Sequence, residues 1–305
     1  MYVSMPTESD PALYYCHLCQ SAGIVTHKTL IDWGCFDNEM ATEILVHNQA
    51  VSKSNKFRKY SRGTRFNVVN RGIRNDEISL AKIAYINNRL GTQLTPREIL
   101  DLKIVINLND LLYQNNIQKL TRDHNIVQDL DRSFVGFLSL DNGFVTLRKV
   151  DNQPVYKAID MRYVNYRLFD KEDTSERFYV VPQQIDLLKP GRIKLHIAEG
   201  VFDILSIYLN VRNKENGIYS SVSGSNYSAI ISYFMVEKMI PNLEVHLYPD
   251  NDKHGSDYKM RKIVNNFDAM RIPIYIHRNM SPNEKDFGVS PNRIKETITK
   301  ANTWI

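Results

Sequence analysis

Several features that mark particular protein classes are scarce in this chain of 305 residues. It has only three cysteines, too few for a secreted disulfide scaffold and suited to a reducing compartment. It has no apolar run near the roughly 20 residues that a transmembrane helix needs. Its first residues, MYVSMPTESD, lack the basic start and apolar core of a secretory signal. We therefore expect a cytoplasmic protein with no membrane partner.

Acidic residues are also absent from one stretch, residues 51–74, although they are common elsewhere. This basic window holds eight Lys and Arg residues, so it carries +8 in a chain whose net charge is only +5. Such a concentration of charge indicates a polyanionic partner, and the aromatic residues within the window suit single-stranded nucleic acid. A solvated linker is the alternative. The residues expected to contact nucleic acid are Lys56, Arg58, Lys59, Arg62 and Arg65.

Residues 76–130 are predicted to form helices. Thr95-Pro96-Arg97-Glu98 has threonine as the N-cap, proline at the first helical position and a glutamate that closes a capping box. Near residue 133 the pattern becomes strand-like, and residues 133–140 and 144–150 flank the hairpin signal Asp141-Asn142-Gly143. This middle part of the chain is therefore expected to be α+β.

From residue 190 onward, short apolar strands alternate with helices. This alternation predicts an α/β domain in which helices flank both faces of a mainly parallel sheet. The predicted strands are residues 193–198, 218–222, 243–248 and 272–277, and the predicted helices are residues 201–209, 226–239 and 256–270.

Acidic residues follow the strands of this α/β part, at the ends where an open parallel sheet forms its sites. Glu199 directly follows the first strand, and Asp250 and Asp252 follow the third. A single acid after a strand is usually a helix N-cap, but an ordered set of this kind is hard to produce by chance. Carboxylates that share one sheet edge repel one another unless cations neutralise them. Two Mg²⁺ or Mn²⁺ ions suit such oxygen ligands and support phosphoryl transfer.

Three further residues extend this set. Asp203 lies one turn into the first helix, close enough to turn back toward the acid after the strand, whereas Lys285 and Asp286 lie in the loop after the fourth strand. HIAEGVFDILS resembles the glutamate motif of TOPRIM domains, YPDNDKHG their Asp-x-Asp motif, and EKDFG their third motif. The resemblance covers about residues 190–290. Many relatives have a further acid in the third motif, where this chain has Gly288.

The TOPRIM resemblance implies a role for each acid. The catalytic residues would be Glu199, Asp250 and Asp252. The ligands of two Mg²⁺ or Mn²⁺ ions would be Glu199, Asp203, Asp250, Asp252 and Asp286.

The residues before the TOPRIM-like part narrow the family further. FVGFLSLDNGFVTLRKV and Arg162-Tyr-Val-Asn165 resemble elements of the RNA polymerase core in bacterial-type primases. This resemblance implies a DNA primase that makes RNA primers from ribonucleoside triphosphates on a single-stranded DNA template. Arg148, Arg162 and Lys285 would then bind the nucleotide. The alternatives are a TOPRIM nuclease and a non-catalytic DNA-binding subunit of replication.

The chain ends soon after its last motif, as phage-encoded primases do. That likeness implies the cytoplasm of a host cell, and it implies that any contact with a replicative helicase comes from outside this chain.

The first residues resemble part of the zinc ribbon of the same primases. Tyr14-Tyr15-Cys16-His17-Leu18-Cys19 is similar to its second knuckle, whereas the first knuckle would lie before Met1. A structural zinc site needs four ligands, so Cys16 and Cys19 form only a half-site unless Cys35 and a histidine complete it. The expected domains are a partial zinc-ribbon-like segment (1–50), a basic α+β lobe (51–185), a TOPRIM domain (190–290) and a C-terminal tail (291–305).

Overall fold

A computed structural model of the chain describes residues 2–3, 13–15, 22–25, 66–117, 124–150, 161–169, 177–186, 191–223, 226–238, 240, 242–251, 256–268 and 272–301. The chain divides into two compact units, Met1–Arg62 and Gly63–Ile305, so the boundary predicted after residue 50 lies twelve residues further along. In the first unit, three short strands form an antiparallel sheet: β1 (Tyr2–Val3), β2 (Leu13–Tyr15) and β3 (Ala22–Ile24).

The second unit begins with helices that start and end at capping residues. The side chain of Asp76 accepts a hydrogen bond from the Ser79 N–H, which begins the first of them. Thr95 and Glu98 form the predicted capping box, and Gly91 ends the preceding helix with a left-handed φ of 62°. The helices are α3 (Glu77–Leu90), α4 (Pro96–Asp101), α5 (Leu108–Gln114) and α6 (His124–Ser133).

These helices accompany a four-stranded antiparallel sheet. Asn142 has a φ of 63° in the turn of the predicted hairpin, which Asp141 stabilises by accepting a hydrogen bond from the Gly143 N–H. The sheet has the order β4-β5-β6-β7. Its strands are β4 (Ile104–Val105), β5 (Phe134–Leu138), β6 (Phe144–Lys149) and β7 (Tyr163–Arg167).

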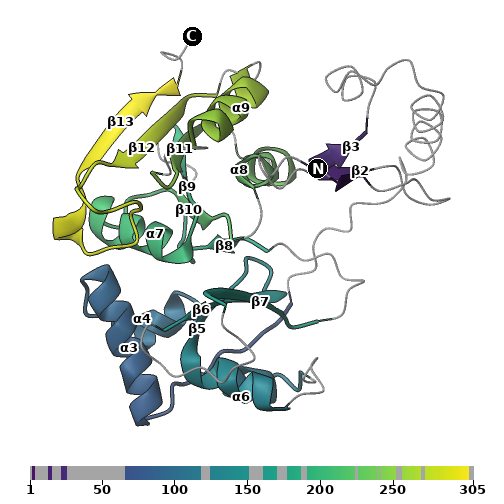
Figure 1. Ribbon diagram of the computed structural model, residues 1–305, viewed down its shortest axis with the longest axis vertical. Helices are drawn as coiled ribbons and strands as arrows, with labels where there is room; N and C mark the ends of the chain where they lie inside the picture. Colours follow the sequence, from purple (N-terminus) through teal and green to yellow (C-terminus); the bar gives the residue numbers. More distant parts are fainter. Residues whose placement is uncertain are drawn as a thin grey trace. The chain divides into compact units, whose positions relative to one another are not determined.

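A six-stranded sheet with the order β13-β12-β11-β9-β10-β8 forms the rest of the unit. The four predicted strands are parallel neighbours in it: β9 (Ile193–Ala198), β10 (Ile218–Ser221), β11 (Leu243–Tyr248) and β12 (Ile274–Asn279). Helix α7 (Val201–Ser206) covers one face, and α8 (Tyr227–Ser232) and α9 (Ser256–Asp268) cover the other (Figure 1). Both α7 and α8 continue into a π-helical turn, at Ile207–Val211 and Tyr233–Glu237. The mixed α/β fold is confirmed.

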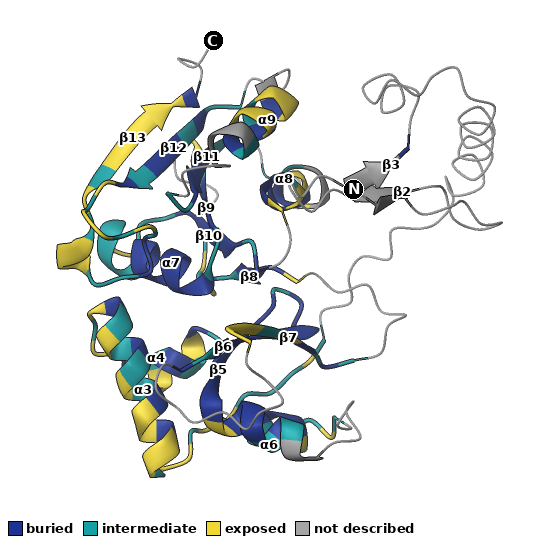
Figure 2. Cartoon of the chain, viewed as in Figure 1, coloured by how far each residue is buried: buried dark blue, intermediate teal, exposed yellow. Residues whose placement is uncertain are grey.

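Both edges of this sheet differ from the predicted domain plan. Residues Glu296–Lys300, expected in a tail, form β13, which pairs antiparallel with β12. At the other edge, β8 (Tyr179–Val180) comes from the segment assigned to the preceding lobe and pairs antiparallel with β10. The prediction of a tail was wrong because an edge strand pairs through its backbone and needs no apolar run. Four of the five residues of β13 are exposed, and its yellow colour stands out in Figure 2.

Two hydrophobic clusters hold the six-stranded sheet, one on each face. One packs α8 and α9 against β9, β11 and β12. The other packs α7 against the opposite face and also includes buried residues of α3, α4 and β5. Phe202 of α7 illustrates this connection, because its ring lies 5.3 Å from that of Phe137 in β5 and 5.8 Å from that of Tyr85 in α3. The two sheets of the unit therefore share one core.

No helix within the described ranges has the length and the apolar character needed to cross a membrane.

Candidate active site

The predicted acids gather at the carboxyl edge of the parallel strands. Ala198 and Tyr248 are register partners on the adjacent strands β9 and β11, so the segments that follow them begin side by side. Glu199 comes one residue after the first strand and Asp250 two residues after the second. Both are partly exposed, as is Asp286 in the loop after β12. The strand order thus places three of the predicted carboxylates at one edge, where solvent reaches them.

Asp203 belongs to the same group but is buried, with 7% of its surface exposed. Its Oδ2 accepts a hydrogen bond of 2.9 Å from the Gly200 N–H, which caps the start of α7. Burial raises the pKa of Asp203 well above its usual value, and the nearby charges of Asp286 and Asp250 raise it further. The side chain therefore turns back toward the strand end, as predicted, and three carboxylates influence one another there.

Tyr227, at the start of α8, lies near the same acids, although it was not identified as a site residue from the sequence. Its hydroxyl donates a hydrogen bond of 3.3 Å to the Tyr248 carbonyl. Burial raises its pKa, and the charges of Glu199, Asp250 and Asp203 add to that effect in this order. A single tyrosine after a polar residue gives no sequence signal, because only the fold brings α8 to the carboxyl edge.

Lys285 neutralises part of the negative charge, although we expected it to bind a nucleotide phosphate. Its Nζ lies 2.7 Å from Oδ2 of Asp250. The lysine side chain is 53% exposed, whereas that of Asp250 is 14% exposed, so solvent reaches the pair mainly from the lysine side. A divalent cation bound at Asp250 would have to displace Lys285.

Gly288 stands where the TOPRIM motif that EKDFG resembles often has another acid, and the surroundings of this glycine leave no room for a side chain. A Cβ at residue 288 would lie 2.5 Å from Oδ1 of Asp203 and 3.3 Å from the Asp203 backbone nitrogen. Real Cβ atoms do not approach other atoms so closely. Asp203 thus fills the space that a side chain at position 288 would need.

Two arginines of the four-stranded sheet and the segment before β7 lie near this edge. Tyr163 of β7 reaches Gly200, since a methyl group added at Gly200 would lie 3.9 Å from its hydroxyl. The guanidinium carbon of Arg148 lies 5.0 Å from the centre of the Tyr163 ring, and that of Arg162 lies 5.8 Å from it. Arg148 is buried, with 3% of its surface exposed, and donates a hydrogen bond to the Arg162 carbonyl at 3.4 Å. Both predicted nucleotide-binding arginines therefore flank a tyrosine at the acidic edge.

Arg89 of α3 is a further cation in this region, and sequence reasoning missed it. Its guanidinium carbon lies 4.6 Å from the centre of the Phe202 ring, in the turn after Gly200. Burial alone would lower its pKa, but Tyr85 and the charge of Asp203 raise it above its ordinary value. An arginine in a helix usually lies on the solvent-exposed face, so the sequence did not distinguish Arg89 from an ordinary surface residue.

Several predicted site residues lie outside the described residues. They are Asp252, the basic residues Lys56, Arg58, Lys59, Arg62 and Arg65, and the cysteines Cys16 and Cys19. The zinc site and the contacts with nucleic acid therefore stay predictions. Among the residues that the structure describes, no three His, Cys, Asp or Glu side chains stand close enough together to hold a metal ion.

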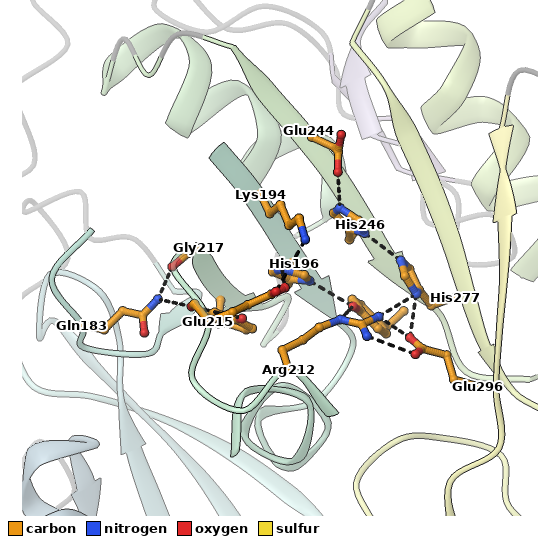
Figure 3. Close-up of polar contacts among 12 residues, drawn as sticks. Gln183, Lys194, His196, Arg212, Glu215, Gly217, Glu244, His246, His277 and Glu296 are labelled. Atoms are coloured by element: carbon orange, nitrogen blue, oxygen red, sulfur yellow. Dashed lines mark hydrogen bonds and ion pairs between the residues drawn. The ribbon is translucent and has the colours of Figure 1, made fainter. Parts of the chain in front are cut away.

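A second polar group lies in the middle of the sheet and was not predicted. His196, His246 and His277 come from the adjacent strands β9, β11 and β12, and all three are buried (Figure 3). The rings of His196 and His246 stack at 4.7 Å. His246 Nδ1 lies 2.8 Å from His277 Nε2, and His277 Nδ1 lies 3.1 Å from a guanidinium nitrogen of Arg212. We call these three residues the histidine layer.

Carboxylates and an arginine contact the histidine layer. His277 Nδ1 lies 2.7 Å from Oε1 of Glu296, which can only accept, and 3.1 Å from a guanidinium nitrogen of Arg212, which can only donate. His246 Nε2 lies 2.9 Å from Oε1 of Glu244. Burial lowers the pKa of His196 to about 4 and that of His246 to about 2. The contacts of the histidine layer link β9, β11 and β12, and the acids of the site follow these same strands.

Comparisons with known proteins give matches among solved structures only. No family model matches the chain, and no curated protein matches it. The chain is similar to a DnaG catalytic core (TM-score 0.43, 14% identity), to a DnaG primase catalytic domain bound to single-stranded DNA (0.45, 14%) and to an E. coli primase catalytic core (0.43, 13%). Each match covers 70% of this chain and 68%, 68% and 69% of the respective structures.

Proposed function

We propose that this chain is the catalytic part of a DNA primase, which joins ribonucleoside triphosphates into short RNA primers on single-stranded DNA. The proposal rests on one observation above all. Carboxylates from three separate segments gather at the carboxyl edge of a parallel sheet: Glu199 with Asp203, Asp250, and Asp286. Such an edge serves phosphoryl transfer when divalent cations bind to it.

The residues on the open side of the edge offer the oxygen ligands that a hard divalent cation prefers. Glu199, Asp250 and Asp286 are partly exposed, although no three acids among the described residues stand close enough together to hold a metal ion by themselves. The pKa of Asp203 is raised first by burial and then by the charges of Asp286 and Asp250, so these three carboxyl groups lie near one another. Asp203 itself suits the role of orienting the other ligands. One of its oxygens already accepts a hydrogen bond from the Gly200 N–H, and the other lies against Gly288. Asp252 follows in the same motif and would complete the ligand set.

The arginines near the acidic edge favour nucleotide transfer over simple hydrolysis. A nuclease needs only metal ions and water at such an edge, whereas a polymerase must also hold the triphosphate of its substrate. Arg148, Arg162 and Arg89 lie around Tyr163 and Phe202, next to the acids. Exposed Arg162 and partly exposed Arg89 would bind and orient a triphosphate, and buried Arg148 would hold Arg162 through its hydrogen bond to the Arg162 carbonyl.

The proposed reaction is attack by the 3′-hydroxyl of the growing primer on the α-phosphorus of the next nucleotide. A bond forms between O3′ and phosphorus, the bond to the β-phosphate oxygen breaks, and pyrophosphate leaves. Two bound Mg²⁺ or Mn²⁺ ions would stabilise the charge on the attacking and leaving oxygens. Glu199 would accept the hydroxyl proton, Asp250 and Asp252 would face the triphosphate, and Lys285, once released from Asp250, would pair with a phosphate.

Primer synthesis on single-stranded DNA with Mg²⁺ and labelled ribonucleotides tests the proposal. Glu199→Gln and Asp250→Asn should each lower the yield of short RNA by about 100-fold or more, the usual cost of losing a general base or its equivalent. Asp101→Asn is a matched control, since this aspartate is 71% exposed on α4 and its nearest cationic partner is Arg97, 4.0 Å away. Its product should equal that of the unaltered chain.

The same assay separates the alternatives. Cut DNA without any need for nucleoside triphosphates would replace the primase by a TOPRIM nuclease. Binding of DNA with neither product would indicate a non-catalytic subunit. Full primer synthesis by either acid variant would remove the assigned site.

A further inference from the structure

Asn279 is the last residue of β12 and is almost completely buried, with 1% of its surface exposed. Its side-chain nitrogen donates to the carbonyls of Asp286, at 2.8 Å, and Arg293, at 3.2 Å. Its side-chain oxygen accepts from the backbone N–H groups of Ser281, at 3.1 Å, and Lys295, at 2.9 Å. An asparagine amide has two donor hydrogens and two acceptor lone pairs, so every hydrogen bond it can make is made here.

All four partners belong to one segment, residues 280–295, which carries the third acidic motif. One amide therefore ties together the start of this loop at Ser281, its middle at Asp286 and its end at Arg293 and Lys295. The bond to the Asp286 carbonyl fixes the backbone from which that carboxylate projects. A loop of this length would otherwise sample many conformations.

Asn251 links the same loop to the second acidic motif. It lies between Asp250 and Asp252, and its backbone N–H donates to the Lys285 carbonyl at 2.7 Å. Its side-chain nitrogen donates to the backbone carbonyl of Asn279. The two asparagines thus connect the segments that carry Asp250 and Asp286 through hydrogen bonds from backbone to backbone and from side chain to backbone.

We propose that Asn279, together with Asn251, is a positioning residue that sets the distance between the carboxylates of Asp250 and Asp286 and hence the affinity of the acidic edge for divalent cations. Neither side chain needs to touch the metal or the nucleotide. The inference rests on the proposed function, because it assumes that these acids bind metal. Outer partners that orient metal ligands commonly affect affinity by 10- to 100-fold.

The direct test measures Mn²⁺ binding to the full chain by electron paramagnetic resonance, in the absence of DNA and nucleotide. Asn279→Ala should raise the dissociation constant of Mn²⁺ by about tenfold or more. In primer synthesis it should raise the Mg²⁺ concentration needed for half-maximal rate by a similar factor. Because the ligands themselves remain, the rate at saturating Mg²⁺ should return close to that of the unaltered chain, which a general loss of structure would not allow.

Asn115 provides a matched control. It also holds a loop through its side chain, since it accepts from the Val69 N–H at 2.7 Å and donates to the carbonyls of Val69 and Leu111, each at 2.7 Å. Asn115→Ala should lower stability but leave the Mn²⁺ dissociation constant unchanged. Asn251 is less buried than Asn279, so Asn251→Ala keeps the test open if Asn279→Ala does not fold, and it should weaken Mn²⁺ binding too.

Unchanged Mn²⁺ affinity in folded Asn279→Ala, or in Asn251→Ala where only that variant folds, would overturn the positioning role. The proposed reaction can fail separately. If the chain binds Mn²⁺ through Asp250, as shown by loss in Asp250→Asn, but makes no primers, the primase proposal is wrong and the positioning role is still decided by binding. If Asp250→Asn leaves Mn²⁺ binding intact, both proposals fail.

Discussion

At the scale of single residues, the contact between Gly288 and Asp203 shows why position 288 has no room for a side chain. Asp203 turns back onto Gly200, which brings its other oxygen against the Cα of Gly288. The two features depend on each other, because a side chain at position 288 and a buried carboxylate at 203 compete for the same space. A larger residue at 288 would require Asp203 to move, and that would remove the cap of α7.

Gly288→Ala should therefore lower the free energy of unfolding by about 1–3 kcal/mol, the usual cost of an added group in a packed site. Chemical denaturation measures this change. The comparison that isolates the cause is the same substitution in an Asp203→Ser background, where the clash is removed. The cost of Gly288→Ala should be smaller there by at least about 0.5 kcal/mol, the size expected for residues in contact. Equal costs in both backgrounds would assign the effect to something other than Asp203.

Some site residues could be predicted from the sequence and others could not, depending on whether their neighbours in the chain already determine their place in the fold. Glu199 and Asp250 follow apolar strands directly, so their neighbours in the chain already place them at a sheet edge. Asn279 has no such local signal, because its four partners lie 2 to 16 residues away along a loop. Arg89 and Tyr227 reach the edge only through the packing of α3 and α8. Residues that act through long-range contacts need the folded structure to be found.

At the scale of elements, the histidine layer couples three strands to pH. The neutral form of His196 is favoured because burial removes the charged form from water, and this lowers its pKa to about 4. Tyr248 donates to or accepts from its Nδ1 at 2.9 Å, and Glu215 and Arg212 are the nearest charged groups. A histidine in an unfolded chain titrates near 6.5. The unfolded state therefore binds more protons than the folded state between these two values.

The contribution of His196 to stability should accordingly be complete above pH 6.5 and should decrease as the pH falls from 6.5 toward 4. Asp203, whose pKa is raised by burial, acts in the opposite direction, so the comparison with a His196 variant isolates the histidine. The contribution of His196 alone is on the order of 3 kcal/mol over that interval, because each pH unit corresponds to about 1.4 kcal/mol per proton. Urea denaturation at a series of pH values measures it. His196→Gln keeps an acceptor for Tyr248 but cannot titrate, so its curve should be flatter in this interval. Parallel curves for the two proteins would exclude His196 as the source.

At the scale of the whole molecule, the parallel part of the fold could be predicted and its edges could not. Residues 193–198 and 243–248 were predicted with the bounds that β9 and β11 have, because buried parallel strands consist of short apolar runs between turns. β13 lacks such a run, since its single large apolar residue, Ile298, is 56% exposed. The connection between the two sheets was also hidden, because contacts between Phe137 and Phe202 join elements far apart in the sequence.

This shared core predicts that Gly63–Ile305 unfolds as one cooperative unit. Phe202 is 2% exposed and contacts both β5 and α3, so Phe202→Ala should cost about 3–5 kcal/mol. Native-state hydrogen exchange should show equal losses of protection in α3 and in β11. Phe234 packs on the opposite face of the six-stranded sheet. Phe234→Ala should lower protection in α3 by the same amount as in β11, since a single unfolding transition exposes the amides of both elements. Protection that persists in α3 while β11 opens would mean that the two sheets unfold independently.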